Sequence, residues 1–349
     1  MESFVVIDEL LASVPGSVVT RLSRVDVGRG REDLFRHQLP SLLTELSTRA
    51  RIESVTASSA LEGVVVADSK RAHKIVVDGA TVLRNRSEQE FAGYRSTLDY
   101  LFTQEWRPMN IGLVLHLHRL LYTHTAMPAG AFKTDDNLVV DRSSDGSVNV
   151  RFRPVSANRT EYYVHELVER YAAEQVRAAH HPVLLVGLFV LDLLTIHPFA
   201  DGNGRVARAL TNALLADCGY GVGRYVSLER QIASTAEDYY DSLLASTRGW
   251  HTREHDPWPW LTYFTATVMA AYEDFEQRAL TQPAMGTKQD RVRAWVVDMA
   301  PAVFRLADAR SALPGISDNT IRLVLESLKA DGRVRPDGSG RGAVWRKSS

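Results

Sequence analysis

Twelve consecutive residues, 197–208, combine the side chains that a phosphoryl-type transfer site needs. A histidine opens the segment, an aspartate and a Gly-Asn-Gly run follow, and two arginines lie near its end. In order they are His197, Pro198, Phe199, Ala200, Asp201, Gly202, Asn203, Gly204, Arg205, Val206, Ala207 and Arg208. Within the segment, the histidine is the group whose ordinary pKa suits proton transfer near neutral pH. The glycines can turn successive N–H groups toward one point and form an anion nest. This combination predicts a site that transfers a phosphorus-containing group by positioning and electrostatics.

The charged residues of the segment have a spacing that suits a polyphosphate. A helix is expected to begin at about Arg205, and its N-terminus favours an anion. Arg205 and Arg208 are three residues apart, so they share one helical surface and can bind separate phosphates. Asp201 at the rim of the loop suits Mg²⁺, which keeps several waters and binds through one carboxylate plus substrate phosphates. The alternative is a glycine-rich turn with a structural histidine and solvated arginines, which explains each feature alone but not their coincidence.

The segment resembles, position for position, the signature H-P-F-x-[DE]-G-N-G-R-x-x-R of the Fic family, and the wider resemblance covers roughly residues 50–280. The resemblance implies a mainly α fold, a helical bundle with a β-hairpin flap. It also implies a protein adenylyltransferase, which moves AMP from ATP to a hydroxyl side chain of a target protein with Mg²⁺ as cofactor. By resemblance, His197 is the base that activates the hydroxyl, Phe199 anchors the loop in the core and Asp201 holds the metal. The residues implied to bind the nucleotide are Gly202, Asn203, Gly204, Arg205 and Arg208.

A second motif lies N-terminal to the first. Ser58 and Glu62 are four residues apart on one helical face, and Gly63 can end that helix. The simplest interpretation is the end of a surface helix. The segment also resembles the family's inhibitory motif [ST]-x-x-x-E-[GN], in which the glutamate pairs with the second arginine, here Arg208. The resemblance therefore implies autoinhibition by Glu62, and it leaves open whether the chain also removes AMP.

Helical periodicity surrounds the motif and positions it. We expect helices over 87–102, 111–122, from Glu161 onward, 183–196, through Asp241 and over 260–279, with 183–196 buried on nearly every side. Residues 127–154 instead alternate like strands around an Asp145-Gly146 turn, which predicts a β-hairpin. The stretch Gly130–Lys133 resembles the start of the family's flap. Gly28, Gly30 and Pro40 are expected to break any long helical pattern in residues 1–50, which we expect to form an ordered arm or a small N-terminal subdomain.

The C-terminal residues predict a separate basic module. Ser317 or Asp318 caps a helix that Gly332 ends, and two short strands are expected around residues 337–340. This order resembles a winged helix-turn-helix. Twelve Lys and Arg residues against seven Asp and Glu residues give residues 288–349 a net charge of +5. DNA binding is one interpretation, and a protein-contact or dimer module of the same fold is the other.

Composition limits the remaining choices. The 349 residues carry a formal net charge of −1, so overall charge favours no class of partner, and the single cysteine, Cys218, excludes a disulfide framework within the chain. The longest apolar run, 183–196, is too short to cross a membrane. We expect a cytoplasmic protein with three domains: an N-terminal arm with the inhibitory helix (1–85), a Fic catalytic domain (86–280) and a winged helix-turn-helix domain (288–349).

Other functions remain open at this point. Some relatives transfer phosphate or phosphocholine through the same site, although the intact Arg208 favours the usual orientation of ATP. The chain could instead be a DNA-binding regulator whose Fic domain senses nucleotide without turnover. Self-modification and homodimer formation are both compatible with the resemblance.

Overall fold

The computed structural model describes residues 1–80, 82–142, 148–281, 288–313, 315–337 and 344–347. It divides the chain into two compact units. The larger unit comprises residues 1–30 and 46–275, and the smaller comprises residues 31–45 and 276–349. The predicted division into an arm, a catalytic domain and a C-terminal domain stays a prediction.

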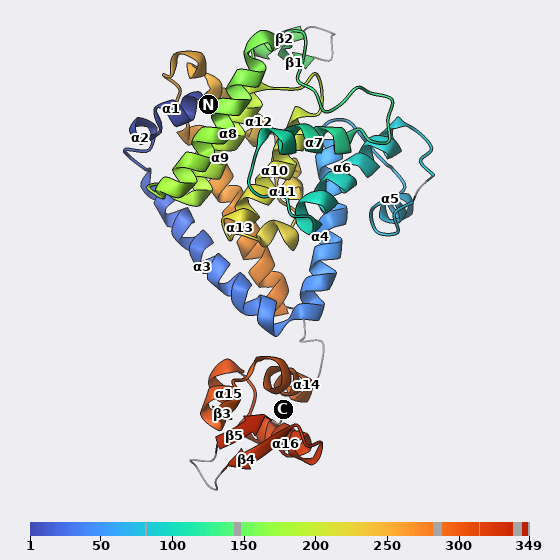
Figure 1. Ribbon diagram of the computed structural model, residues 1–349, viewed down its shortest axis with the longest axis vertical. Helices are drawn as coiled ribbons and strands as arrows, with labels where there is room; N and C mark the ends of the chain where they lie inside the picture. The colour runs from blue at the N-terminus through green and yellow to red at the C-terminus, as the bar shows by residue number, and fades with distance from the viewer. Residues whose placement is uncertain (81, 143–147, 282–287, 314, 338–343, 348–349) are drawn as a thin grey trace. The chain divides into compact units, whose positions relative to one another are not determined.

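The larger unit is helical with one hairpin (Figure 1). Its helices are α1 (Glu2–Val5), α2 (Ile7–Leu10), α5 (Ser69–Val76), α6 (Arg86–Thr103), α7 (Ile111–Leu121), α8 (Ala157–Arg177), α9 (Pro182–Ile196), α10 (Asn203–Asp217), α11 (Leu228–Ser234) and α12 (Ala236–Thr247), with 3-10 turns at Val222–Arg224 and Trp250–Thr252. The helices with residues in both units are α3 (Gly16–Gln38), α4 (Pro40–Ala60) and α13 (Trp258–Thr281). The expected mainly helical fold is confirmed, and no helix in the described part of the chain is long and apolar enough to cross a membrane.

Helix α9 forms the centre of the larger unit, where it packs against α8 and α10 (Figure 1). Every residue from Val183 to Leu193 is buried, as expected for a helix that is apolar on nearly every face. The helix begins at Pro182, which suits the first helical position because proline has no N–H to satisfy. The imidazole Nδ1 of His181 accepts a hydrogen bond from the Val183 N–H at 3.2 Å. These signals fix the start of α9, and the helix ends at Ile196, directly before His197.

The predicted hairpin is present as β1 (Val139–Arg142) paired antiparallel with β2 (Val148–Phe152). Its predicted Asp145-Gly146 turn lies outside the described residues. The prediction that the hairpin begins at Gly130–Lys133 is wrong, because these residues precede β1 and form no strand. Gly130 has a φ of 80°, and the Lys133 side chain is buried rather than alternating outward.

The expectation that Gly28, Gly30 and Pro40 break any long helical pattern is also wrong. Helix α3 continues through Gly28 and Gly30, and Pro40 begins α4 instead of interrupting it. At Gly28 a Cβ would lie 2.7 Å from the ring of Tyr272. The missing side chain therefore allows close packing that offsets the poor helix propensity of glycine.

The smaller unit has its own core. Its elements after residue 287 are α14 (Lys288–Ala294), a π-helical turn (Trp295–Met299), β3 (Val303–Arg305), α15 (Leu306–Ala312), α16 (Asp318–Ala330), β4 (Val334–Asp337) and β5 (Val344–Lys347). The strands form an antiparallel sheet in the order β3-β5-β4. The predicted apolar face of α16 is buried, namely Ile321, Val324, Leu325 and Leu328. The Ser317 hydroxyl caps this helix by accepting from the Thr320 N–H at 3.3 Å.

The loop at 338–340, around which the two short strands were predicted, lies outside the described residues. The strand β3 and the helix α15 were not predicted, because both are short and neither shows a clear period.

Candidate active site

His197, the first residue of the predicted motif, follows directly after α9. It adopts the left-handed conformation with φ of 54° and ψ of 61°, which residues with a Cβ adopt rarely. Its Nδ1 lies 3.2 Å from the carbonyl oxygen of Leu194. Because a carbonyl only accepts, Nδ1 carries the proton and Nε2 keeps its lone pair. Burial lowers the pKa of His197 to about 4, although the hydrogen bond to Leu194 acts in the other direction and raises it. The imidazole is therefore neutral near pH 7 and can accept a proton at Nε2.

The loop after His197 is held by side chains of the motif itself. Phe199 is fully buried and its ring stacks on that of His118, with centroids 3.9 Å apart. The amide of Asn203 bonds to both polar atoms of the Phe199 backbone, accepting from N–H at 2.8 Å and donating to the carbonyl at 2.7 Å. Phe199 thus lies in the core, as its predicted role as an anchor requires. The Asn203 side chain closes the loop, so a phosphate would meet this residue through its main chain.

The two glycines of the motif lie where a side chain would not fit. Gly202 precedes α10 with a φ of 80°, and a Cβ there would lie 2.8 Å from Leu121 and 3.0 Å from the hydroxyl of Tyr122. A Cβ at Gly204 would overlap the carboxylate of Glu62 and lie 2.9 Å from the guanidinium of Arg208. Since α10 begins at Asn203, the N–H groups of its first turn have no partners within the helix and are available to an anion.

Arg208 is buried and is bonded entirely to the second motif. Its Nη2 donates to Oε1 of Glu62 at 2.7 Å and to the carbonyl of Ser58 at 3.1 Å, and its Nε donates to the Ser58 hydroxyl at 2.9 Å. Ser58 is in the last turn of α4, and Gly63 has a φ of 74° just beyond its end. Burial is the largest single influence on the pKa of Arg208 and lowers it, but Glu62, Tyr239 and Tyr94 together outweigh burial and raise the pKa above its ordinary value.

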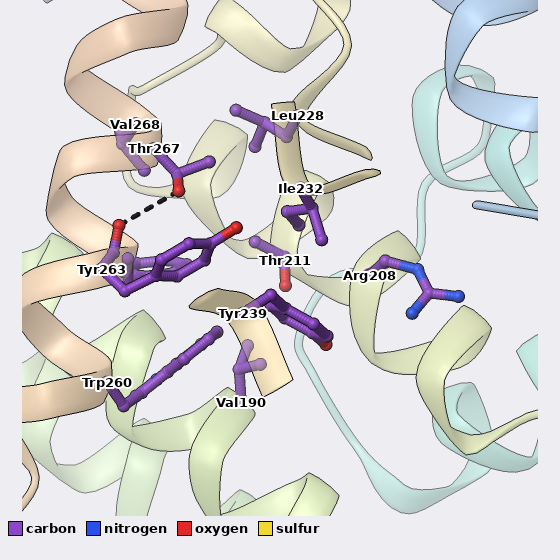
Figure 2. Close-up of a pocket in the computed structure, with 11 residues that line it drawn as sticks. Val190, Arg208, Thr211, Leu228, Ile232, Tyr239, Trp260, Tyr263, Thr267 and Val268 are labelled. Atoms are coloured by element: carbon purple, nitrogen blue, oxygen red, sulfur yellow. Dashed lines mark hydrogen bonds between the residues drawn. The ribbon is translucent and has the colours of Figure 1, made fainter. Parts of the chain in front are cut away.

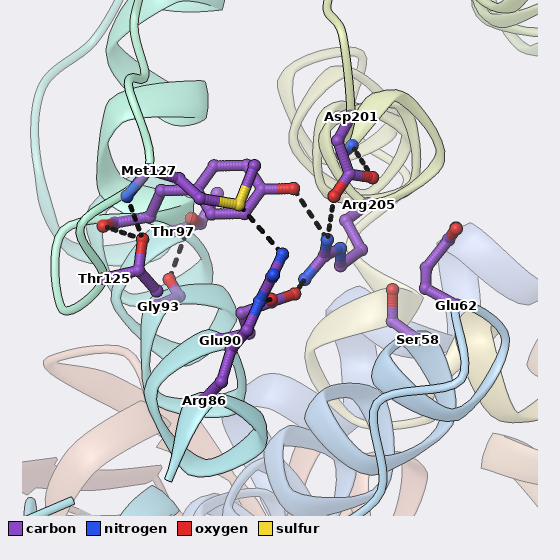
Figure 3. A network of polar contacts seen from close by, with 12 residues as sticks. Ser58, Glu62, Arg86, Glu90, Gly93, Thr97, Thr125, Met127, Asp201 and Arg205 are labelled. Atoms are coloured by element: carbon purple, nitrogen blue, oxygen red, sulfur yellow. Dashed lines mark hydrogen bonds and ion pairs between the residues drawn. The ribbon is translucent and has the colours of Figure 1, made fainter.

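Arg205 points to a different network (Figure 3). Its Nη1 donates to Glu90 at 2.7 Å and its Nη2 donates to the Tyr122 hydroxyl at 2.8 Å. Arg205 is buried, and its other neighbour is the Asp201 carboxylate at 3.8 Å. The structure therefore separates the two arginines of the motif. Arg208 faces the second motif, whereas Arg205 supports the loop through Glu90 of α6.

Asp201 has an accessible carboxylate, with 46% of its side chain exposed. Its Oδ1 accepts the Gly202 N–H at 2.7 Å, which fixes the carboxylate at the mouth of the loop. Among the described residues no group of three metal-ligating side chains occurs. An accessible single carboxylate fits Mg²⁺, which keeps waters and takes its other ligands from phosphates.

A cavity of about 220 Å³ opens beside His197. Its polar wall contains Glu62, Gly204 and Arg208. The rest of the lining comes mainly from the hairpin and from α12: Val139, Arg151, Phe152, Leu194, Tyr239, Tyr240, Leu243, Leu244 and Thr247. An apolar recess with a few convergent polar groups is typical of a small-molecule site.

A second cavity lies behind Arg208, but it has a volume of only about 20 Å³ (Figure 2). Its walls include Tyr239 and Trp260, which are buried, and the Thr267 hydroxyl, which donates to the Tyr263 carbonyl at 3.0 Å. Figure 2 shows the Arg208 guanidinium pointing away from it. The space holds a single water molecule at most, so a nucleotide would have to bind in the larger cavity.

Several residues that hold the site were not predicted from the sequence. They are Glu90, His118, Tyr122, Lys133 and Asn137. Glu90 could have been paired with Arg86 by its i,i+4 spacing, and that ion pair is present at 2.6 Å. Nothing in the sequence indicates that the same carboxylate also bonds to a residue far along the chain.

Comparison with known proteins agrees with this geometry. Residues 108–215 match the model of the Fic/DOC family. A protein named "Protein adenylyltransferase Fic" from Drosophila mojavensis is 27% identical over 207 residues, which cover 57% of this chain and 38% of that protein. The "Protein adenylyltransferase and cysteine protease IbpA" of Histophilus somni is 22% identical over 214 residues, covering 61% of this chain and 5% of that protein. The chain thus spans well under half the length of these relatives.

Solved structures share the fold. A Fic family protein from Desulfovibrio desulfuricans superposes with a TM-score of 0.64 and 20% identity, covering 97% of both chains. A Fic domain containing signaling protein from Bacteroides thetaiotaomicron has a TM-score of 0.60 and 20% identity over 75% of this chain and 99% of that one. Residues 108–215 are thus similar to the Fic/DOC family domain, and the motif at 197–208 lies within the matched residues.

Proposed function

We propose that this chain is a protein adenylyltransferase, which moves AMP from ATP to the hydroxyl group of a Ser, Thr or Tyr side chain on a target protein. The observation that carries the proposal is the cavity beside His197, where a neutral histidine, the start of α10 and Arg208 meet an apolar recess. Relatives that are named protein adenylyltransferases support AMP transfer as the activity of the family.

The proposed reaction begins with a proton transfer. Nε2 of His197 takes the proton of the target hydroxyl while the oxygen attacks the α-phosphorus of ATP. A new P–O bond forms, the bond from the α-phosphorus to the bridging oxygen breaks, and pyrophosphate leaves. The N–H groups of the first turn of α10 stabilise the charge on the phosphate oxygens. Asp201 would hold Mg²⁺, which neutralises phosphate charge when it is bound.

We also propose that Glu62 inhibits this reaction. The Arg208 guanidinium donates three hydrogen bonds to Ser58 and Glu62. The terminal phosphate of ATP would need the same guanidinium. While Glu62 remains bound there, ATP can bind only with its phosphates displaced, and the α-phosphorus then lies out of line with the hydroxyl.

Intact-mass measurement after incubation with ATP and Mg²⁺ tests both proposals. The proteins are the wild type, Glu62→Gly, Ser58→Ala and Glu62→Gly/His197→Ala, with a cell lysate offered as target and α-labelled ATP as reporter. We expect strong transfer by Glu62→Gly and weaker transfer by Ser58→Ala, which keeps the Glu62 ion pair. The wild type and the His197 double variant should transfer little.

The labels separate the competing reactions. Label that is transferred from γ-labelled but not α-labelled ATP would identify phosphate transfer instead. Absence of transfer by every variant would contradict AMP transfer. Equal activity of the wild type and Glu62→Gly would contradict inhibition by Glu62.

A second candidate function rests on the smaller unit. The order of α14, β3, α15, α16, β4 and β5 is compatible with a winged helix-turn-helix, and α16 presents Arg322 and Lys329 to solvent. A regulator that binds DNA through α16 and senses nucleotide in the larger unit would use these features. The same face carries the exposed Leu323 and Glu326, which suit contact with a protein.

A further inference from the structure

A buried lysine lies next to the catalytic loop. The Lys133 side chain belongs to the segment that precedes β1, and only 6% of the residue is exposed. Its ammonium donates to the carbonyl of Ile196 at 3.2 Å and to Oδ1 of Asn137 at 2.8 Å. Burying an ammonium group is costly unless it is hydrogen-bonded or paired with an opposite charge. Here one of those bonds goes to the residue immediately before His197.

The same segment holds the other side of His197. The Lys133 N–H donates to the Pro198 carbonyl at 2.9 Å, and Nδ2 of Asn137 donates to the Phe199 carbonyl at 3.0 Å. The carbonyls of residues 196, 198 and 199 are thus all fixed from residues 133 and 137. His197 lies between them in a left-handed conformation that is unfavourable for a residue with a Cβ. Such a conformation persists only when its surroundings determine it.

The charge of Lys133 acts on the same histidine. After burial and the Leu194 hydrogen bond, the positive charge of Lys133 is the next cause that changes the pKa of His197, and it lowers it. The acidic groups that oppose it are Glu62 near the end of α4 and Asp201 of the loop. Asp136, on the same segment, raises the pKa of Lys133. Arg208 also lines the cavity beside His197.

We propose that Lys133 is a positioning residue for catalysis, which holds His197 in its working conformation through the carbonyls on either side of it. This proposal rests on the proposed function of the site. Lys133 does not line the cavity beside His197, so its contribution should concern the base and not the binding of nucleotide. Asn137 completes the contact, since it bonds both to the ammonium and to the loop.

The test uses the Glu62→Gly protein as the active reference and adds Lys133→Met, Lys133→Arg or Asn137→Ala. The control is Asp135→Asn, because Asp135 is exposed and bonds only locally to Thr134 at 3.0 Å. Rates of AMP transfer are measured against ATP concentration and pH, and thermal unfolding checks the fold of each protein.

We expect Lys133→Met to lower kcat by about 100-fold, the order that a small displacement of a catalytic group produces, with little change in KM for ATP. The acid limb of the pH–rate profile of Lys133→Met should move to higher pH, because loss of the positive neighbour raises the pKa of His197. Lys133→Arg should recover most of the rate and return the acid limb of the pH–rate profile to its position in the reference protein. Burial lowers the pKa of Lys133 to about 8, so the Arg variant should also keep its activity to higher pH.

Three results would overturn the proposal: an unchanged kcat in Lys133→Met, an unmoved acid limb, or a loss of rate that only follows loss of folding and that Arg does not recover. If the Glu62→Gly reference transfers no AMP, the proposed function fails separately. NMR titration of His197 in wild type and Lys133→Met then still decides the matter, since equal pKa values of His197 would contradict the positioning role.

Discussion

At the scale of residues, burial determines the protonation of the histidines near the loop. Burial lowers the pKa of both His118 and His197 to about 4. Each is therefore neutral in the folded chain at pH values where the unfolded chain would be protonated. The burial that keeps both imidazoles neutral near pH 7 also couples stability to pH.

We predict that the free energy of unfolding falls as the pH is lowered from about 6.5 toward 4. Over this range the unfolded chain takes up protons at His118 and His197 that the folded chain does not, and above it neither state is protonated. The loss between pH 6.5 and 5.5 should be roughly 1 kcal/mol per histidine. Urea unfolding at both pH values measures it. His197→Asn should remove the part of this loss that comes from His197, and an equal loss in the wild type and in His197→Asn would contradict the prediction.

At the scale of elements, the sequence signals were strongest where one helix or loop contains the whole pattern. The buried α9, the glycine loop and the apolar face of α16 could be predicted because their residues are neighbours in the chain. The residues that bond to the motif from elsewhere in the chain could not be predicted. Glu90 bonds to Arg205 and Lys133 to Ile196 across long separations, and which polar groups meet there depends on how α6, α7 and the segment before β1 pack.

The long helix α3 shows a different limit. Glycine disfavours a helix by about 1 kcal/mol relative to alanine, so Gly28 and Gly30 were expected to interrupt it. Intrinsic propensity is a weak signal when a close packing contact compensates for it. Gly28 has such a contact with Tyr272, whereas a Cβ at Gly30 would meet nothing within 4 Å.

These two glycines give a matched pair of substitutions. Gly30→Ala should raise the free energy of unfolding by about 1 kcal/mol, because alanine favours the helix and the site is open. Gly28→Ala should lower it by about 1–3 kcal/mol, because its Cβ would overlap the ring of Tyr272. Urea unfolding at neutral pH measures both. Stabilisation by both substitutions would show that α3 does not approach α13 at Gly28.

At the scale of the whole molecule, the chain combines a unit that contains the candidate active site with a smaller unit that has its own core. The exposed face of α16 carries Arg322 and Lys329, although Lys329 is 3.1 Å from Glu326 and part of its charge is thereby neutralised. Arg322 and the exposed Arg333 beyond the end of α16 are therefore the basic side chains that would contact phosphates.

The full-length protein should retard duplex DNA if α16 binds it, and the logarithm of the binding constant should fall linearly with the logarithm of the salt concentration. Arg322→Ala and Arg333→Ala should each reduce the slope by about 0.9, because each removes one phosphate contact. Arg24→Ala is the control of equal charge, since Arg24 is an exposed arginine of the larger unit. An equal effect of all three substitutions would indicate nonspecific attraction, and no retardation by the wild type would exclude DNA as the partner. Retardation by a protein whose Glu62→Gly variant transfers no AMP would instead favour the nucleotide-sensing regulator over the transferase.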